Sequence, residues 1–267
     1  MRPTFTDSRT SIRLSGVAAP GAEDRQRKIP GFDQAAYSRS RVLCIGAGGL
    51  ISHIAPTLVR KGIGGLTVLD NDVVEVTNLN RQRFYAKDIG HNKAIALVEN
   101  LQSECIVVTD LRGYALRLED AIAEGLDLSC NVAICGVDNN PARVAASRYF
   151  RAQQTPVIFV AVSRDADHGY ALVQDKDGPC IACCFPDMIN DERYPCPGTP
   201  AVADVLQALG ALATYAADTL IVRRLRQWNY RRISLSGFAI DGAAVVPSRK
   251  GCGLCSRDES ATLGGRS

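Results

Sequence analysis

A glycine-rich turn is the first segment of this chain whose residue types suggest chemistry. The residues Gly46-Ala47-Gly48-Gly49 follow an apolar run, and Asp70 ends the next apolar run. Glycines after a strand let backbone N–H groups approach a phosphate at a helix N-terminus, and an acid after the next strand binds the ribose hydroxyls. The pattern predicts nucleotide binding by Gly46, Gly48, Gly49 and Asp70. Alone, the turn also fits an ordinary tight turn of an α/β fold.

Further polar residues follow that turn in a way that simple dinucleotide binding does not require. They are Asn78, Arg81 and Gln82, in the run Asn78-Leu-Asn-Arg-Gln82, together with Lys93. Fixed cations placed there would offset the charge that a triphosphate develops during transfer. The alternative is that Arg81 and Lys93 are solvated surface cations. Since helical amphipathicity does not account for this run, we predict chemistry on ATP.

Two carboxylates offer oxygen ligands for a metal. Asp138 lies just beyond the apolar run Val132–Cys135, and a carboxylate at that position can hold Mg²⁺ against phosphates. Its alternative role is to cap a helix that begins near Pro141. Asp72 has three open interpretations: it orients Arg81, binds a metal, or only forms a turn.

Four cysteines form two close pairs with the spacing of a structural zinc site. The pairs are Cys180-Ile-Ala-Cys183 and Cys252-Gly-Leu-Cys255. Four thiolates complete a tetrahedral site and leave no position for water, so such a zinc ion is structural. Free or redox-active cysteines are the alternative.

Cys196, in a proline- and glycine-rich loop before a long helix, is the preferred nucleophile. The helix dipole favours a thiolate near a helix start, which suits attack on an acyl-adenylate. Cys184 competes for this role, although its position beside the second zinc cysteine also fits simple packing. His53, His91 and His168 receive no role from the sequence.

Alternating strand and helix patterns are expected to position these residues. The patterns predict a Rossmann-like, mainly parallel sheet flanked by helices, with ligands at the carboxyl ends of its strands, and then an antiparallel C-terminal extension. Residues 1–22 lack periodicity and are predicted to be a mobile leader. The predicted strands are 41–45, 66–69, 106–110, 132–135, 156–162, 169–174, 233–240 and 243–246, and the predicted helices are 32–37, 50–60, 92–101, 141–149 and 202–226.

Composition excludes several other classes of protein. Of 267 residues, 31 are basic and 28 acidic, which gives a net charge of +3 and no reason to expect nucleic acid as the main partner. No apolar run of about 18 residues or signal core is present, which disfavours membrane insertion and secretion. We therefore expect a cytoplasmic protein.

Taken together, the motifs resemble those of the ThiF/MoeB/HesA superfamily, bacterial relatives of ubiquitin-activating enzymes. The resemblance covers about 25–255 and rests on the glycine turn, the following polar runs and both cysteine pairs, with Arg25-Gln26, Gly90-His-Asn-Lys93 and Asp138-Asn139. It implies that ATP and Mg²⁺ are used to adenylate the C-terminal Gly-Gly carboxylate of a small ubiquitin-like or sulfur-carrier protein. It also implies a homodimer.

The resemblance assigns roles to individual residues. It implies that Asp70 binds ribose, that Asp138 binds magnesium, and that Arg25 reaches into the site of the partner subunit. Cys196 occupies the position of the cysteine that joins the activated carrier in thiamine-pathway members. The residues implied to contact the phosphates are Asn78, Arg81, Gln82 and Lys93.

The expected organisation is one adenylation domain over 23–256, followed by a flexible tail over 257–267. Within it, a nucleotide-binding core covers about 23–163, and a crossover loop with the zinc, dimer and carrier-binding part covers about 164–256. Ile51 stands where the family turn has glycine, which predicts a slightly opened turn. The sequence shows no rhodanese-like extension, so we expect a partner to supply any sulfur.

Three rival functions stay open. One is an activating enzyme of a conjugation pathway that forms a thioester on Cys196 and passes the carrier to a second thiol enzyme. The others are a dinucleotide-dependent oxidoreductase and a nucleotide-binding scaffold without catalysis. The tail residues Leu263-Gly264-Gly265 resemble ubiquitin-like C-termini, but flexible-tail composition explains them more simply.

Overall fold

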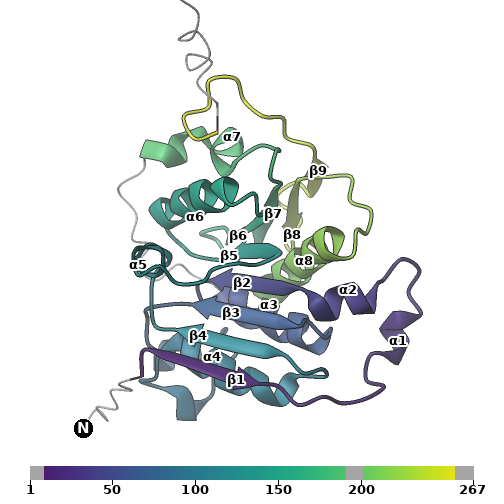
Figure 1. The fold of residues 1–267 in the computed structure, drawn as a ribbon. Helices are drawn as coiled ribbons and strands as arrows, with labels where there is room; N and C mark the ends of the chain where they lie inside the picture. Colours follow the sequence, from purple (N-terminus) through teal and green to yellow (C-terminus); the bar gives the residue numbers. More distant parts are fainter. Residues whose placement is uncertain (1–8, 191–200, 256–267) are drawn as a thin grey trace, which may run out of the picture.

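The computed structural model describes residues 9–190 and 201–255, which form one nine-stranded sheet with helices on both faces (Figure 1). The strands are β1 (Ser11–Ser15), β2 (Arg41–Ile45), β3 (Gly65–Leu69), β4 (Asp110–Tyr114), β5 (Val132–Cys135), β6 (Val157–Val162), β7 (His168–Gln174), β8 (Tyr230–Ser234) and β9 (Gly242–Ala244). The α-helices are α1 (Asp24–Arg27), α2 (Gln34–Arg39), α3 (Gly49–Arg60), α4 (Lys93–Leu101), α5 (Leu118–Ala123), α6 (Asn140–Ala152), α7 (Ile181–Cys184) and α8 (Ala203–Ile221).

The strand order is β1-β4-β3-β2-β5-β6-β7-β8-β9. Strands β4, β3, β2, β5 and β6 pair in parallel, whereas β1 at one edge and β7, β8 and β9 at the other pair antiparallel. The chain builds outward from β2 to β3 and β4 and then returns to add β5 on the other side of β2. This order confirms the predicted fold class. It also creates a switch point between β2 and β5, where such folds bind ligands.

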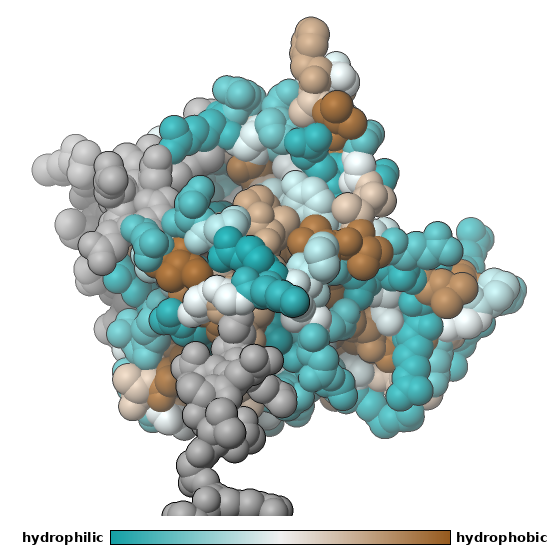
Figure 2. All heavy atoms as spheres, turned by 90° about the horizontal axis from the view of Figure 1, so that it is seen from above, coloured by the Kyte–Doolittle hydropathy of each residue, from teal (hydrophilic) through white to brown (hydrophobic). Residues whose placement is uncertain are grey.

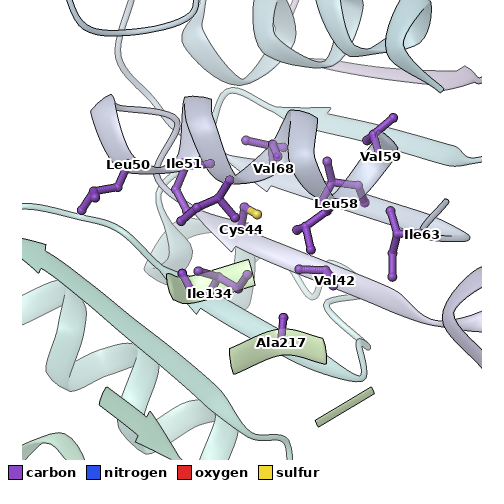
Figure 3. Close-up of a cluster of buried hydrophobic side chains, with 14 of the residues drawn as sticks. Val42, Cys44, Leu50, Ile51, Leu58, Val59, Ile63, Val68, Ile134 and Ala217 are labelled. Carbon is purple, nitrogen blue, oxygen red and sulfur yellow. The ribbon is translucent and has the colours of Figure 1, made fainter. Parts of the chain in front are cut away.

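Two apolar cores lie on opposite faces of the sheet. Side chains of α3, α4 and α8 cover one face, and part of that core is shown in Figure 3, where Val42 of β2 lies between Leu58 of α3 and Ala217 of α8. Side chains of α5 and α6 cover the other face together with Ile181 of α7. Because both faces are covered, the central strands are mostly apolar instead of alternating.

The predicted leader is in part a strand, so that prediction was wrong for Ser11–Ser15. These residues form β1, which pairs antiparallel with β4 from Ser11↔Tyr114 to Ser15↔Asp110. The Asp110 carboxylate accepts hydrogen bonds from Arg13 Nε (2.8 Å), Arg41 Nη1 (2.9 Å) and Arg112 Nη2 (2.9 Å). Burial opposes ionisation, yet these guanidinium groups hold the pKa of Asp110 well below its usual range. Long-range pairing, which local periodicity does not reveal, orders this segment.

Several element boundaries also differ from expectation, and the strand predicted over 233–240 is instead β8, Tyr230–Ser234. The strand predicted over 106–110 begins only at Asp110, because Thr109 O and Ile106 O accept hydrogen bonds from Gly16 N (2.9 Å) and Ala19 N (2.8 Å) rather than pairing with β3. Helix α8 ends at Ile221 instead of residue 226, since Arg223 adopts a left-handed φ of +56°. In the described parts of the chain, no helix is long and apolar enough to span a membrane.

Candidate active site

The glycine turn joins β2 to α3 at the switch point. Gly46 has a φ of +89°, which an L side chain rarely adopts, and its N–H donates to Leu69 O (2.8 Å). A Cβ at Gly48 would meet no atom within 4 Å, so the turn faces open space just before α3. The first N–H groups of a helix lack intrahelical partners. The turn therefore presents free donors where a phosphate can approach.

Ile51 does not open this turn. It is completely buried, and a Cβ at Gly136, just after β5, would lie 2.8 Å from Ile51 Cγ1. Gly136 N also donates to Ile45 O (3.0 Å), which keeps the two segments together. The missing side chain at residue 136 thus makes room for Ile51, and the opening that we predicted from the sequence was wrong.

Asp70 ties the end of β3 to the glycine turn. Its Oδ2 accepts a hydrogen bond from Ala47 N (2.6 Å), and its Oδ1 accepts one from Asp72 N (2.7 Å). Burial raises the pKa of Asp70 to about 6, although the nearby positive charge of Lys93 acts in the opposite direction. A carboxylate oxygen has two lone pairs, so both oxygens can also accept from ribose hydroxyls.

Lys93 lies beside Asp70 and Asp72 at the start of α4. Its Nζ is 3.0 Å from Asp72 Oδ2, and only 12% of its side chain is exposed. Asn92 holds this arrangement, because its Nδ2 donates to Asp70 O (2.8 Å) and Asp72 O (3.0 Å) while its Oδ1 caps α4. Asp72 therefore pairs with Lys93 and not with Arg81.

The segment 78–82 contributes two buried amides. Asn78 is 7% exposed, and its Oδ1 accepts from Glu75 N (3.0 Å), so this side chain fixes its own loop. Gln82 is 9% exposed, and its Oε1 has no hydrogen-bond partner among the described residues. A buried, unpaired acceptor is costly. Gln82 Oε1 thus requires a hydrogen-bond donor such as water, whereas a phosphate could only accept from the Gln82 Nε2.

Arg81 is held mainly by its own loop. Its Nη1 donates to Thr77 O (2.7 Å) and Asn80 Oδ1 (3.0 Å). A guanidinium group has five N–H donors. Arg81 therefore keeps donors for an anion, and its present contacts are with neutral groups.

Asp138 follows β5 at the switch point and is exposed. The cap of α6 is Asn139, whose Oδ1 accepts from Ala142 N (2.9 Å), so the capping role considered for Asp138 was wrong. Within residues 9–190 and 201–255 its carboxylate has no hydrogen-bond or ion-pair partner. The chemistry of such an oxygen donor fits Mg²⁺.

These residues lie in the loops after β2, β3 and β5 or at the start of a following helix, near the carboxyl edge of neighbouring parallel strands. We call this set the nucleotide edge; it comprises Gly46–Gly49, Asp70, Asp72, Asn78, Arg81, Gln82, Lys93 and Asp138.

The four predicted zinc cysteines meet in a second site, the cysteine cluster. The Sγ atoms of Cys180, Cys183, Cys252 and Cys255 all lie within 4.8 Å of one another. The Cys180–Cys252 and Cys183–Cys255 Sγ distances are both 3.4 Å, and the Cys180–Cys183 distance is 3.8 Å. Tetrahedral bonds of about 2.3 Å to zinc place sulfurs nearly 4 Å apart. The donor set and its compactness fit a structural zinc ion.

A family model described as the ThiF family matches residues 23–243. The chain belongs to the ThiF family. Among curated relatives, it is 31% identical to the SAMP-activating enzyme E1 of Haloferax volcanii, over 62% of this chain and 61% of that protein. It is 30% identical to the sulfur carrier protein adenylyltransferase of Thermus thermophilus, over 71% of each.

Solved structures agree on the fold. E. coli MccB, crystallised with AMPCPP and MccA, has a TM-score of 0.71 over 89% of this chain and 75% of that one, at 20% identity. The chain spans only about half of some longer relatives, such as 49% of MOCS3 from Xenopus laevis.

Arg25 lies away from the nucleotide edge of this ThiF-family chain. It is an exposed residue of α1, and the neighbouring Gln26 Nε2 donates to Lys61 O (2.7 Å), at the end of α3. The glycine turn lies at the other end of that 12-residue helix, about 18 Å away at 1.5 Å per residue. The structure does not bring Arg25 together with the other predicted residues.

Of the two candidate nucleophiles of this ThiF-family chain, Cys184 lies in the described part of the structure. Cys196 lies outside the described residues. Cys184 is half-buried, and burial, with a smaller contribution from Cys183, raises its pKa to about 11. A raised pKa disfavours the thiolate that attack requires.

Sequence reasoning missed some residues that shape the site. Asn92 joins Asp70 to α4, and Ser52 and His53 of α3 contact the loop that contains Arg81. The Asn92 cap was readable from its position before an apolar helix. The contacts of Ser52 and His53 are tertiary, so no local signal marked them.

Proposed function

We propose that this ThiF-family chain is an ATP-dependent adenylyltransferase that activates the C-terminal glycine carboxylate of a small ubiquitin-like or sulfur-carrier protein. The observation that carries the proposal is the nucleotide edge. There, the amides of the glycine turn, the carboxylate of Asp70 and the charged groups of Arg81, Lys93 and Asp138 follow neighbouring parallel strands. The names of relatives such as sulfur carrier protein adenylyltransferase support the same reaction.

In the first step, a carboxylate oxygen of the carrier attacks the α-phosphorus of ATP. A new P–O bond forms, the bond from the α-phosphorus to the bridging oxygen breaks, and pyrophosphate leaves with the electron pair. The turn amides hold the nucleotide, Asp70 accepts from ribose, and Arg81, Gln82 and Lys93 contact the phosphates. Asp138 would hold Mg²⁺, which offsets phosphate charge when bound.

In the second step, a thiolate attacks the carbonyl carbon of the acyl-adenylate, and AMP leaves as the new thioester forms. We assign this thiol to Cys196, which occupies the position of the carrier-joining cysteine in the family resemblance, and keep Cys184 as the alternative. Alternatively, sulfide or a persulfide from a partner attacks directly. If the thioester passes to a second thiol enzyme, the chain serves conjugation instead, which suits the relative called SAMP-activating enzyme E1.

A homodimer is part of this proposal. Arg25 lies near the end of α3 opposite to the glycine turn, which argues against a role in its own site, and the family resemblance suggests a role in the site of the partner subunit. Mixing equal amounts of two inactive variants, Arg25→Ala and Arg81→Ala, should restore about a quarter of the activity if subunits exchange at random. No recovery in a mixed dimer would remove this role from Arg25.

The deciding experiment is ATP–pyrophosphate exchange with a Gly-Gly-ended carrier encoded in the same genome. Exchange should require the carrier, and Cys196→Ala should keep exchange while abolishing the trapped thioester. Cys184→Ala is the matched control and should keep both. Failure of every such carrier to support exchange by the folded protein would refute the adenylation proposal.

A further inference from the structure

Two consecutive side chains of α3 hold the backbone of the loop 81–83. Ser52 Oγ accepts a hydrogen bond from Arg83 N (3.2 Å), and His53 Nε2 lies 3.0 Å from Arg81 O. One contact lies on each side of Gln82. Helix α3, which begins at the glycine turn, therefore binds the backbone on both sides of Gln82, a buried residue of the nucleotide edge.

His53 must act as the donor in its contact. A carbonyl oxygen only accepts, so the hydrogen lies on Nε2. Burial lowers the pKa of His53, even though the bond to Arg81 O favours the protonated form. Hydrogen-bond donation to Arg81 persists in the neutral ring, since one ring nitrogen always carries hydrogen.

Helix α8 packs against α3 next to His53. A Cβ at Gly210 would lie 3.4 Å from His53 Cβ, which is an ordinary van der Waals contact. The backbone of α8 therefore passes close to the base of the His53 side chain.

What His53 fixes is the relative position of two phosphate-binding parts. The turn amides belong to the start of α3, whereas Arg81 and Gln82 belong to a loop after β3. The Arg81 guanidinium contacts Thr77 O and Asn80 in its own loop. Backbone contacts such as those of His53 and Ser52 therefore set the distance between these parts.

We propose that His53 is a positioning residue for adenylyl transfer: by holding the Arg81 carbonyl, it keeps Arg81 and Gln82 in register with the glycine turn. This inference rests on the proposed function for its kinetic consequences. It does not require His53 to touch ATP or to exchange a proton.

The test compares His53→Ala and His53→Gln with Thr57→Val. Thr57 lies one turn further along α3, and its hydroxyl donates only to His53 O (3.1 Å), so its loss perturbs the helix without touching the loop. In His53→Ala we expect kcat/KM for ATP in the exchange assay to fall about tenfold, as for one lost hydrogen bond. We also expect faster amide hydrogen exchange over residues 76–85. His53→Gln, which keeps an N–H donor, should recover most of both.

The proposal is overturned if His53→Ala matches Thr57→Val in both measurements, or if loop exchange rises while ATP kinetics stay unchanged. If the wild-type protein shows no pyrophosphate exchange, the proposed function fails separately. The dissociation constant for ATP, measured by equilibrium dialysis, then replaces kcat/KM and is expected to rise about tenfold in His53→Ala. Equal ATP affinities, or rescue failing in His53→Gln, would then overturn the positioning role.

Discussion

The nucleotide edge and the cysteine cluster are assembled in different ways. At the nucleotide edge, each residue follows a strand of one parallel sheet and is fixed by hydrogen bonds such as those from Asp70 to Ala47 and Asp72. The cysteine cluster joins two segments that lie 72 residues apart, and the contacts between its thiols take the place of strand pairing. One site is built by the fold, whereas we propose that the other relies on a zinc ion to hold its two segments together.

Loss of zinc should have the largest effect, and it should fall on one region. Cys183→Ser removes a thiolate ligand, and structural zinc contributes roughly 10–16 kcal/mol in small peptides. We expect loss of bound zinc, measured by mass spectrometry, and rapid proteolysis within residues 245–255. ATP binding at the other site should weaken far less.

Cys130→Ser is the matched control, because Cys130 is a partly exposed thiol outside the cluster. It should retain zinc. Equal loss of zinc and ATP binding in Cys183→Ser would show that the two regions are not built independently.

Removing a charged group from the nucleotide edge should reduce activity and leave the zinc site unchanged. Arg81→Ala and Asp138→Ala each remove a group that stabilises phosphate charge, a change that typically costs about 10²–10³ in rate. Pyrophosphate exchange should fall by that factor, while zinc content and melting temperature stay near those of the wild type. A comparable loss in Arg83→Ala, a neighbouring exposed arginine, would indicate a general charge effect.

A smaller effect is expected where the glycine turn packs on β5. Gly136→Ala places a Cβ 2.8 Å from Ile51 Cγ1, and overpacking costs about 1–3 kcal/mol. Chemical denaturation should show this loss, and Ile51→Ala should offset part of it in the double variant. Gly242→Ala, which meets no atom within 4 Å, is the control. Additive losses in the double variant would argue against the Gly136–Ile51 fit.

The smallest effect concerns pH. Burial raises the pKa of Asp70 to about 6, so its carboxylate is ionised above that pH and gains a proton as pH falls through it. We expect wild-type ATP affinity to weaken several-fold between about pH 7 and pH 5. The Asp70→Asn variant should bind ATP weakly over this whole pH range and should not show this pH-dependent loss of affinity. The titration of ATP itself affects both proteins equally. Parallel pH profiles would remove Asp70 from the ribose contact.

The sequence predicted the parallel core and the grouping of the four cysteines because their signals are local, whereas the roles assigned to the nucleotide edge stay predictions. Glycine turns, apolar runs and paired cysteines have fixed short spacings. It did not predict α5, nor the pairing of β1 with β4, because strand pairing at long range leaves no periodic trace. The contact made by His53 was not predicted for the same reason, because the carbonyl that it contacts lies 28 residues away in the sequence.

The sequence predicted the exposed apolar side chains less well than the buried core. Figure 2 shows hydrophobic residues in separate patches among hydrophilic ones on the face drawn there. Some exposed apolar side chains, including Phe238 at 95% and Ile240 at 75%, lie between β8 and β9. Neither composition nor motif spacing marked them in advance, because exposure depends on the tertiary fold.

The bonds from three arginines to Asp110 bear on how this protein behaves in solution. A shortened chain beginning at Glu23 would lose β1 and Arg13, and the edge of β4 would be left unpaired. Exposed strand edges invite pairing between molecules. Light scattering should reveal self-association of the shortened chain, and a fully monodisperse sample would contradict this. We therefore expect β1 to protect the protein from aggregation by covering the edge of β4.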